Sequence, residues 1–343
     1  MKVLVTGGTG FVGAHTVAAL VEAGHEVRVL ARRPERVATT LGALGVDLAK
    51  LDVVEGDMVD PNAVGEAVTG MDAVIHAAAV VAALDRKYAE AALHTNVDGT
   101  RTVLDAAIAA GCDPVVHVSS IAALFTPEVE LLTVDLPPVV DADNPYTRSK
   151  ALADDLARDR QAAGAPVVIV YPGGVVGPRV GEVCGDAAEG FASILRLGFL
   201  SLTDGGINVI DARDLAAVLV ATLAPGRGAR RYMAAGQLVM LPEVLRIFRQ
   251  STSRRLPSMP TPASVYRVLG RLLDAVRRVI PFNTVFTAEA MELLTQPKDS
   301  DDSAVAKELG VHYRDVTGTI ADGLRGLYEA GHLSPKQAGV LAR

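Results

Sequence analysis

The chain has 343 residues, of which 50% are hydrophobic, enough for one large domain or for a domain with a second lobe. Its formal net charge of −7, without a long basic run, argues against a nucleic-acid-binding protein. Cys112 and Cys184 form neither a disulfide framework nor a zinc site, so we expect two core thiols and no bound metal. Met1 leads directly into a strand and no apolar run reaches transmembrane length, which favours a cytoplasmic protein.

Apolar runs alternate with helical stretches in the first half of the chain, which predicts a parallel sheet covered on both faces. The predicted strands are 3–5, 27–30, a strand ending at 53–54, 73–76, 115–118 and 167–170, and the predicted helices are 11–23, 97–110 and 146–163. After Pro172 we expect a loop over 173–190, a strand over 207–210, a helix over 214–223 and a mostly helical remainder from Tyr232. The fold class is therefore α/β, doubly wound, with a smaller helical lobe.

A glycine-rich turn follows the first predicted strand and opens the first helix, in the order Thr6-Gly7-Gly8-Thr9-Gly10-Phe11-Val12-Gly13. In a dinucleotide site the first glycine allows a tight turn, the second admits the pyrophosphate, and the third lets the helix pack closely. Free N–H groups at the helix start would bind the phosphates. A glycine-rich turn without a ligand is the alternative.

The end of the second strand indicates which cofactor would bind. An NAD site usually places a carboxylate there, but this chain has Leu30-Ala31-Arg32-Arg33. A guanidinium pairs well with a 2′-phosphate, so we expect NADP(H), with Arg32 the better candidate and solvated arginines the alternative. Asp57, after the third strand, either accepts a hydrogen bond from adenine or is a turn residue.

Tyr146 and Lys150 lie four residues apart and share one face of a predicted helix. An ammonium beside a phenol lowers the pKa of that phenol, which makes a proton donor for carbonyl–alcohol chemistry. Taken alone the two could form a surface pair. Together with the glycine turn, and with Ser120 at a strand end, they indicate a catalytic site. His117 is expected in the core, and Asp211 and Asp214 at a helix N-terminus.

An ordered set of motifs resembles the extended short-chain dehydrogenase/reductase family. These are the glycine turn, Gly56-Asp57-Met58, His76-Ala77-Ala78-Ala79, Asn96-Val97-Asp98-Gly99-Thr100, Val118-Ser119-Ser120, Tyr146 with Lys150, and Pro172-Gly173-Gly174-Val175. The chain looks most like the dihydroflavonol reductase and 3β-hydroxysteroid dehydrogenase branches. Tyr171 departs from the arginine that the family often has before this proline, which puts the local packing in doubt.

The resemblance implies a division into an NADP-binding Rossmann domain, 1–176 with 207–230, and a substrate-binding lobe, 177–206 with 231–343. It implies catalysis by Ser120, Tyr146 and Lys150, with Ser119 as the fallback for Ser120, and a role for Asn96 in supporting the active-site end of its helix. The implied cofactor contacts are Gly7, Thr9, Gly10, Phe11, Val12, Gly13, Arg32, Arg33, Asp57, Met58, Ala77, Ala78, Ala79, Asn96, Val118, Tyr146, Lys150, Pro172, Gly174 and Val175.

The expected activity is NADP(H)-dependent interconversion of a carbonyl and an alcohol on a hydrophobic small molecule. A nucleotide-sugar epimerase of the same fold and a non-catalytic NADP-binding sensor are the alternatives. Ile121-Ala122 after Ser120, where a sugar dehydratase carries an acidic pair, counts against that branch. By analogy with the family, the helices 97–110 and 146–163 could form a homodimer. A basic amphipathic stretch over 265–280 either covers the substrate cleft or lies on a membrane.

Overall fold

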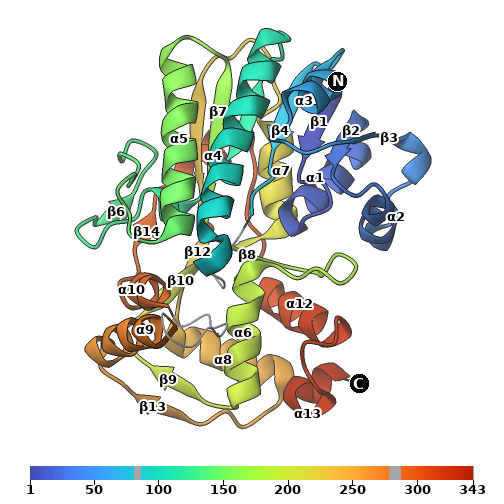
Figure 1. Ribbon diagram of the computed structural model, residues 1–343. Helices are drawn as coiled ribbons and strands as arrows, with labels where there is room; N and C mark the ends of the chain where they lie inside the picture. The colour runs from blue at the N-terminus through green and yellow to red at the C-terminus, as the bar shows by residue number, and fades with distance from the viewer. Residues whose placement is uncertain (81–85, 278–286, 343) are drawn as a thin grey trace.

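A computed structural model of the protein describes residues 1–80, 86–277 and 287–342. Figure 1 shows an upper part built on a large sheet, which contains the N-terminus. The lower part consists mainly of helices and contains the C-terminus. The expected α/β sheet with a helical C-terminal portion is confirmed.

Seven parallel strands form the large sheet, in the order β11-β7-β5-β4-β1-β2-β3. They are β1 (Lys2–Thr6), β2 (Glu26–Ala31), β3 (Leu51–Glu55), β4 (Ala73–His76), β5 (Val115–Val118), β7 (Val167–Pro172) and β11 (Arg230–Ala234). Every side chain of β4, β5 and β7 is buried, because both faces of these central strands are covered. This explains why their sequences lack polar alternation.

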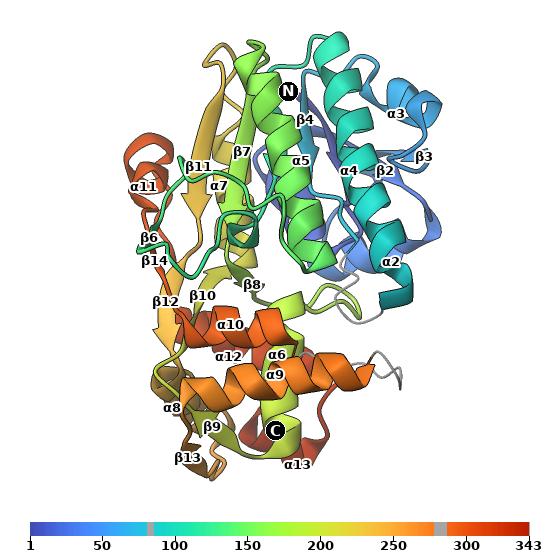
Figure 2. The same cartoon turned by 60° about the vertical axis from the view of Figure 1, so that its left-hand side comes forward.

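Helices cover both faces of the sheet. One face packs on α1 (Phe11–Glu22), α2 (Glu35–Leu41), α7 (Ala212–Ala221) and α11 (Ser303–Leu309); the other packs on α3 (Pro61–Val68), α4 (Arg86–Ala109) and α5 (Pro145–Ala162). Figures 1 and 2 show α4 and α5 side by side in front of the sheet. Short 3₁₀ turns are η1 (Gly42–Leu44), η2 (Leu48–Lys50), η3 (Ile121–Ala123) and η4 (Gly339–Ala342).

The order in which strands are added to the sheet reverses between β1 and β4. From β1 the chain proceeds to β2 and β3, and then returns to place β4 on the other side of β1. In a doubly wound sheet, ligands bind at the carboxyl ends of the strands at such a point. Thr6 and His76, which are paired across the two strands, mark this position.

The lower part has its own apolar core and small sheets. Its helices are α6 (Asp186–Leu197), α8 (Leu241–Thr252), α9 (Ala263–Arg277), α10 (Ala288–Thr295), α12 (Val316–Glu329) and α13 (Pro335–Ala338). In its small sheets β10 (Gly206–Asp211) pairs with both β12 (Gln237–Met240) and β8 (Gly174–Val176), and β13 (Ser258–Pro260) pairs with β9 (Leu200–Leu202). A further pair, β14 (Asp299–Ser300) with β6 (Leu131–Leu132), lies beside the upper part, where Leu132 joins the core of the large sheet. Among the described helices, none has the length and apolarity needed to span a bilayer.

Three elements differ from the sequence prediction. Helix α4 begins at Arg86 rather than at residue 97. The predicted part is the one in which Val103, Leu104 and Ala107 pack on the sheet, and this apolar pattern is what the prediction followed. The expected loop over 173–190 contains β8 and the start of α6. Strand β11 occupies 230–234, where a helical region was expected to begin at Tyr232. Residues 230–234 pair with β7 and so belong to the large sheet. The two arginines at the start of this edge strand hide its apolar pattern in the sequence. The rest of the two-lobe division stays a prediction.

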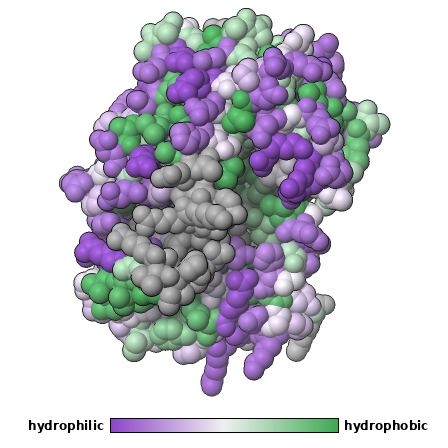
Figure 3. All heavy atoms as spheres, viewed as in Figure 1, coloured by the Kyte–Doolittle hydropathy of each residue, from purple (hydrophilic) through white to green (hydrophobic). Residues whose placement is uncertain are grey.

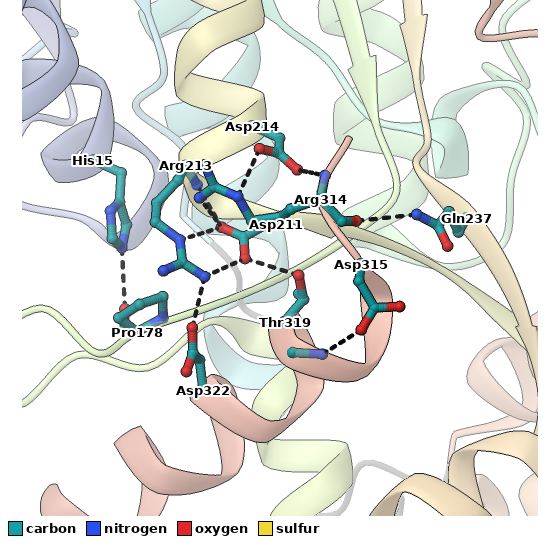
Figure 4. Close-up of polar contacts among 11 residues, drawn as sticks. His15, Pro178, Asp211, Arg213, Asp214, Gln237, Arg314, Asp315, Thr319 and Asp322 are labelled. Carbon is teal, nitrogen blue, oxygen red and sulfur yellow. Dashed lines mark hydrogen bonds and ion pairs between the residues drawn. The ribbon is translucent and has the colours of Figure 1, made fainter. Parts of the chain in front are cut away.

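A cluster of charged side chains joins α7 to α12 (Figure 4). The buried carboxylate of Asp211 caps α7 by accepting the N–H of Arg213 at 2.8 Å. The Arg213 guanidinium also donates to both of its oxygens, at 2.9 and 2.7 Å, and Thr319 of α12 donates at 2.8 Å. Burial would raise the pKa of Asp211, but these hydrogen bonds hold it below its ordinary value. The expected capping role of Asp211 is confirmed.

Asp214 does more than the expected interaction with the helix dipole. Its carboxylate accepts the backbone N–H of Arg314 at 2.8 Å and lies 3.1 Å from the guanidinium of that residue. Arg213 also reaches Asp322 of α12 at 2.7 Å. The C-terminal segment is therefore fixed to the start of α7 by several charge-assisted hydrogen bonds.

We expect Arg213→Met to lower the free energy of unfolding by about 1–3 kcal/mol, because it leaves a buried carboxylate with fewer donors. The stability of the wild type should fall as pH drops through the depressed pKa of Asp211, and this loss should begin at higher pH in the variant. Urea unfolding at several pH values measures both effects. Arg246→Met, which breaks an exposed ion pair with Glu243, is the control and should cost clearly less than Arg213→Met. Equal costs for the two variants would contradict this assignment.

Candidate active site

The glycine turn after β1 is sterically restricted to glycine at two positions. Gly7 has φ +76°, and a Cβ there would lie 2.7 Å from the backbone of Ala78, at the end of β4. A Cβ on Gly13 would lie 2.1 Å from the Gly7 carbonyl oxygen. Gly10 is exposed, and its added Cβ would meet only that same oxygen, at 3.2 Å. The turn is therefore compact inside and open at Gly10.

The start of α1 fits a phosphate group. Gly10 is the N-cap and provides no side-chain hydrogen bond to the helix, so no cap side chain occupies the first N–H groups. Thr9 and Val12 are half-buried beside it. The ring of Phe11 is buried, with its centroid 5.2 Å from the His15 ring, which leaves only its backbone available to a ligand. These features match the pyrophosphate cradle of a dinucleotide site.

Arg32 and Asp57 meet at the ends of β2 and β3. Arg32 Nη1 lies 3.9 Å from Asp57 Oδ2, and the side chains are 66% and 38% exposed. Asp57 also accepts the N–H of Val59 at 3.2 Å, as a turn aspartate does. Arg33 is exposed beside them, whereas Met58 is buried against Gly99 of α4. This corner thus offers guanidiniums and one carboxylate to solvent.

Asn96 of α4 connects the loop after β4 to α5 by hydrogen bonds. Its amide oxygen accepts the N–H of Val80 at 2.7 Å, and its amide nitrogen donates to the Val80 carbonyl at 3.0 Å. The same nitrogen donates to the hydroxyl of Ser149 on α5 at 3.0 Å. Ala77, Ala78 and Ala79, the half-buried start of this loop, follow directly after His76. Asn96 therefore fixes the loop beside the glycine turn and also the N-terminal part of α5.

Helix α5 brings Tyr146 and Lys150 to the carboxyl end of the sheet. Its N-cap, Asn144, accepts the N–H groups of Tyr146 and Thr147 at 2.8 and 3.3 Å, and Pro145 occupies the first turn. Tyr146 is half-buried. Lys150, one turn later, is 7% exposed, and its Nζ donates to the carbonyl of Val118 at 3.2 Å. The ammonium thus lies at the end of β5.

The positions of the two adjacent serines distinguish their roles. Ser120 is half-buried and caps η3, accepting the N–H of Ala122 at 3.2 Å. Helix α5 packs against η3, so Ser120 lies near that helix. Ser119 is buried, and its hydroxyl has no hydrogen-bond partner among the described residues. Only Ser120 is accessible to a substrate, which favours it over the fallback.

Two buried histidines lie beneath the front helices. Their rings stack with centroids 5.6 Å apart, His76 on β4 and His117 on β5. His76 bonds Thr6 at 2.7 Å and Thr100 at 3.0 Å, whereas neither ring nitrogen of His117 has a partner among the described residues. Burial, and then the charge of Lys150, lower the pKa of His76 to about 3 and that of His117 well below its usual value. Both are therefore neutral, and His117 lies in the core as expected.

Tyr171 of β7, which departs from the family pattern, forms a buried hydrogen-bond network with two charged side chains of α5. Its hydroxyl accepts a hydrogen bond from Arg158 at 2.8 Å and donates to Asp154 at 3.3 Å. Arg158 also pairs with Asp154 one turn away, at 2.8 Å. Burial raises the pKa of Asp154, and Arg158 opposes that rise. The i, i+4 spacing of Asp154 and Arg158 could have indicated this network, which sequence reasoning missed.

The segment after β7 forms the last side of the site. Pro172 ends β7, and Gly174 and Val175 begin β8, which pairs with β10. A Cβ on Gly173 would lie 2.3 Å from the Ala235 carbonyl oxygen, so the chain passes very close to the segment after β11. The predicted residues from β1, β4, β5, α5 and β7 all lie at the carboxyl end of one sheet. Arg32, Arg33 and Asp57 lie farther along the same edge, after β2 and β3.

Comparison with known proteins adds a family match. Residues 3–234 match the model of the NAD dependent epimerase/dehydratase family. Over 96% of its length the chain is 29% identical to sterol demethylase protein B of Methylococcus capsulatus, covering 99% of that protein. It is 27% identical to a putative dihydroflavonol 4-reductase of Synechocystis, with 96% and 95% of the two chains covered.

A solved structure shares the fold. UDP-glucose-4-epimerase from Stenotrophomonas maltophila, with bound NAD and formylated UDP-arabinopyranose, superposes with a TM-score of 0.76. The alignment covers 97% of this chain and all of that one, at 20% identity. At this identity the likeness concerns the fold.

The buried histidines predict an acid-sensitive fold. Below pH 6.5 the unfolded chain takes up protons at these imidazoles, whereas folded His76 does so only near pH 3. Stability should therefore fall as pH decreases across this window. His117→Phe should reduce the slope between about pH 5.5 and 4 by up to about 1.4 kcal/mol per pH unit. Urea unfolding measures this, with His94→Gln, an exposed histidine on α4, as the control. An unchanged slope in His117→Phe would contradict the prediction.

Proposed function

The chain belongs to the NAD dependent epimerase/dehydratase family, and from that premise we propose that it uses NADP(H) to interconvert a carbonyl and an alcohol on a hydrophobic small molecule. Family membership also confirms the resemblance to extended short-chain dehydrogenases/reductases, and with it an oxidoreductase-type enzyme that uses a nicotinamide dinucleotide. The choice of phosphate form, the reaction and the substrate class are the proposed parts.

The proposed cofactor path follows the carboxyl edge of the sheet. Gly7, Gly10 and Gly13 would hold the pyrophosphate, and Arg32 would bind the 2′-phosphate. Arg33 lies next to Arg32, while Asp57 is the nearest acceptor for an adenine amino group. When bound, such a cofactor supplies or accepts the hydride. The exposure of Arg32 and its loose 3.9 Å contact with Asp57 leave its guanidinium able to turn toward a phosphate.

The rest of the proposed cofactor site comes from backbone and small side chains. Several residues would offer N–H groups or close contact without a charged side chain: Thr9, Phe11, Val12, Met58, Ala77, Ala78, Ala79, Val118, Pro172, Gly174 and Val175. Asn96 would act indirectly, since its amide is already occupied by Val80 and Ser149.

The proton transfer is assigned to Tyr146. In the reducing direction its hydroxyl would donate a proton to the carbonyl oxygen as that oxygen gains charge. Lys150 would stabilise the phenolate that remains and hold the nicotinamide ribose. Ser120 would donate a hydrogen bond to the same substrate oxygen, which orients it and stabilises its developing charge.

The position of Lys150 is the observation that carries this proposal. The ammonium is 7% exposed and held by the Val118 carbonyl, directly where β5 ends and Ser119-Ser120 begin. Ser149, its neighbour, is hydrogen-bonded to Asn96 and to the Tyr146 carbonyl, at 3.0 and 2.7 Å. A surface i, i+4 pair would not be buried and anchored in this way. The arrangement supports a fixed cation one turn from a phenol.

The hydrophobic substrate class is supported by two relatives whose names refer to a sterol and a dihydroflavonol. A nucleotide-sugar epimerase of the same fold is the alternative, because a solved structure with this fold is an epimerase. The two activities differ in redox balance. A reductase consumes one cofactor per product, whereas an epimerase regenerates its cofactor in each cycle.

We predict that NADPH binds at least about tenfold more tightly than NADH, a difference of about 1.4 kcal/mol. Arg32→Gln should remove most of this preference, because the 2′-phosphate loses a bidentate partner. Fluorescence titration with both reduced cofactors measures it, and Arg101→Gln, an exposed arginine of α4, is the matched control. Equal affinities of the wild type for the two cofactors would refute the role of Arg32.

We predict that Tyr146→Phe lowers the turnover of hydrophobic ketones by about 10²–10⁴-fold, since the proton donor is lost. The affinity for the preferred reduced cofactor should change by less than about tenfold. The assay is NADPH oxidation with a panel that includes 3-oxosteroids, run beside epimer formation from UDP-sugars. Tyr328→Phe, a half-buried tyrosine of α12, is the control and should retain activity. Epimer formation without net NADPH consumption would overturn the reductase assignment.

A further inference from the structure

Among the described residues, the contacts that fix helix α9 to the lower part of the molecule lie on one side of the helix. Tyr266 is buried and its hydroxyl donates to the carbonyl of Ser201. Gly270 lies so close to α10 that a Cβ would meet Ala288 Cα at 2.8 Å. The Asp274 carboxylate accepts the N–H of Ala288 at 2.9 Å. These contacts determine which side of the helix faces the protein.

The opposite side of α9 exposes a continuous apolar stripe. Its members recur at helical spacing and are 39–61% exposed: Val265, Val268, Leu269, Leu272 and Val276. Figure 3 shows hydrophobic residues gathered at the lower left, where Figure 1 places α9. Single exposed apolar residues are ordinary, but five on one face of one helix mark an interaction surface.

The charges beside the stripe are positive. Arg267 and Arg271 lie one turn apart along its edge, and Arg271 is exposed. The one carboxylate of the helix, Asp274, is directed inward to Ala288. The exposed side of α9 therefore presents guanidiniums and aliphatic side chains, although the whole chain has a net charge of −7.

We propose that α9 docks the protein on the surface of an anionic lipid bilayer. The apolar stripe would lie at the boundary between headgroups and acyl chains, and the arginines would lie at the lipid phosphates. An amphipathic helix with a basic edge binds in this orientation, with its apolar face buried about 5–10 Å. A second copy of the chain fits less well. A twofold contact between stripes would bring Arg267 and Arg271 of both copies into one interface, and like charges there are unfavourable. The proposal does not depend on the reaction.

Flotation of the full chain with vesicles tests the proposal. The vesicles would be phosphatidylcholine, with and without about one third phosphatidylserine. The protein should float with the anionic vesicles and not with the neutral ones, and the bound fraction should fall as salt increases. The double substitution Val268→Ser with Leu272→Ser should weaken binding at least about tenfold, and so should Arg267→Gln with Arg271→Gln. Thermal unfolding checks that each variant is folded.

Val53→Ser with Leu131→Ser is the matched control, because these exposed apolar residues lie on the strands β3 and β6. It should bind vesicles as the wild type does. The proposal would be overturned if the wild type failed to float, if it bound neutral vesicles equally well, or if the stripe variant kept full binding. A concentration-dependent dimer that the stripe substitutions weaken, without vesicle binding, would identify a second copy as the occupant.

Discussion

The buried ammonium of Lys150 is the constraint on which the proposed site depends. A charge placed between a sheet and its covering helices loses most of its hydration, so its position is restricted to where donors and acceptors are satisfied. The carbonyl of Val118, at the end of β5, provides one such partner. The same burial and the same charge keep His76 and His117 neutral. With Asn96 holding Ser149, the first turn of α5 has little freedom, and Tyr146 is carried on it.

The order of strands explains why the proposed catalytic residues and the proposed cofactor path lie close together. Because β1 and β4 are neighbours at the reversal of the sheet, the glycine turn and the loop after His76 lie side by side. The steric contact of Gly7 with Ala78 expresses this proximity directly. Strand β5 is next to β4, so Ser120 and the partner of Lys150 follow on the same edge. The proposed cofactor path from Arg32 to Tyr146 follows the carboxyl ends of the strands, because all strands of the large sheet are parallel.

Much of this arrangement was predictable from residues. Uninterrupted apolar runs predicted the central strands, and the spacing of Tyr146 and Lys150 predicted one shared helix face. The Asn144-Pro145 start of α5 also carried a readable capping signal. What could not be predicted depends on distant contacts. Tyr171 is held by Arg158 and Asp154, and β11 is a strand only because β7 lies beside it. The side of α9 that would be left uncovered was set by Gly270 and α10, not by its own amphipathic pattern.

A crystal structure with NADP⁺ bound would test the central claim most directly. The account predicts the 2′-phosphate against Arg32, the nicotinamide ribose within hydrogen-bond reach of Lys150 Nζ, and the nicotinamide ring facing the Tyr146 hydroxyl. A cofactor bound with its nicotinamide far from these two side chains would contradict it, and so would a Tyr146 hydroxyl directed into bulk solvent.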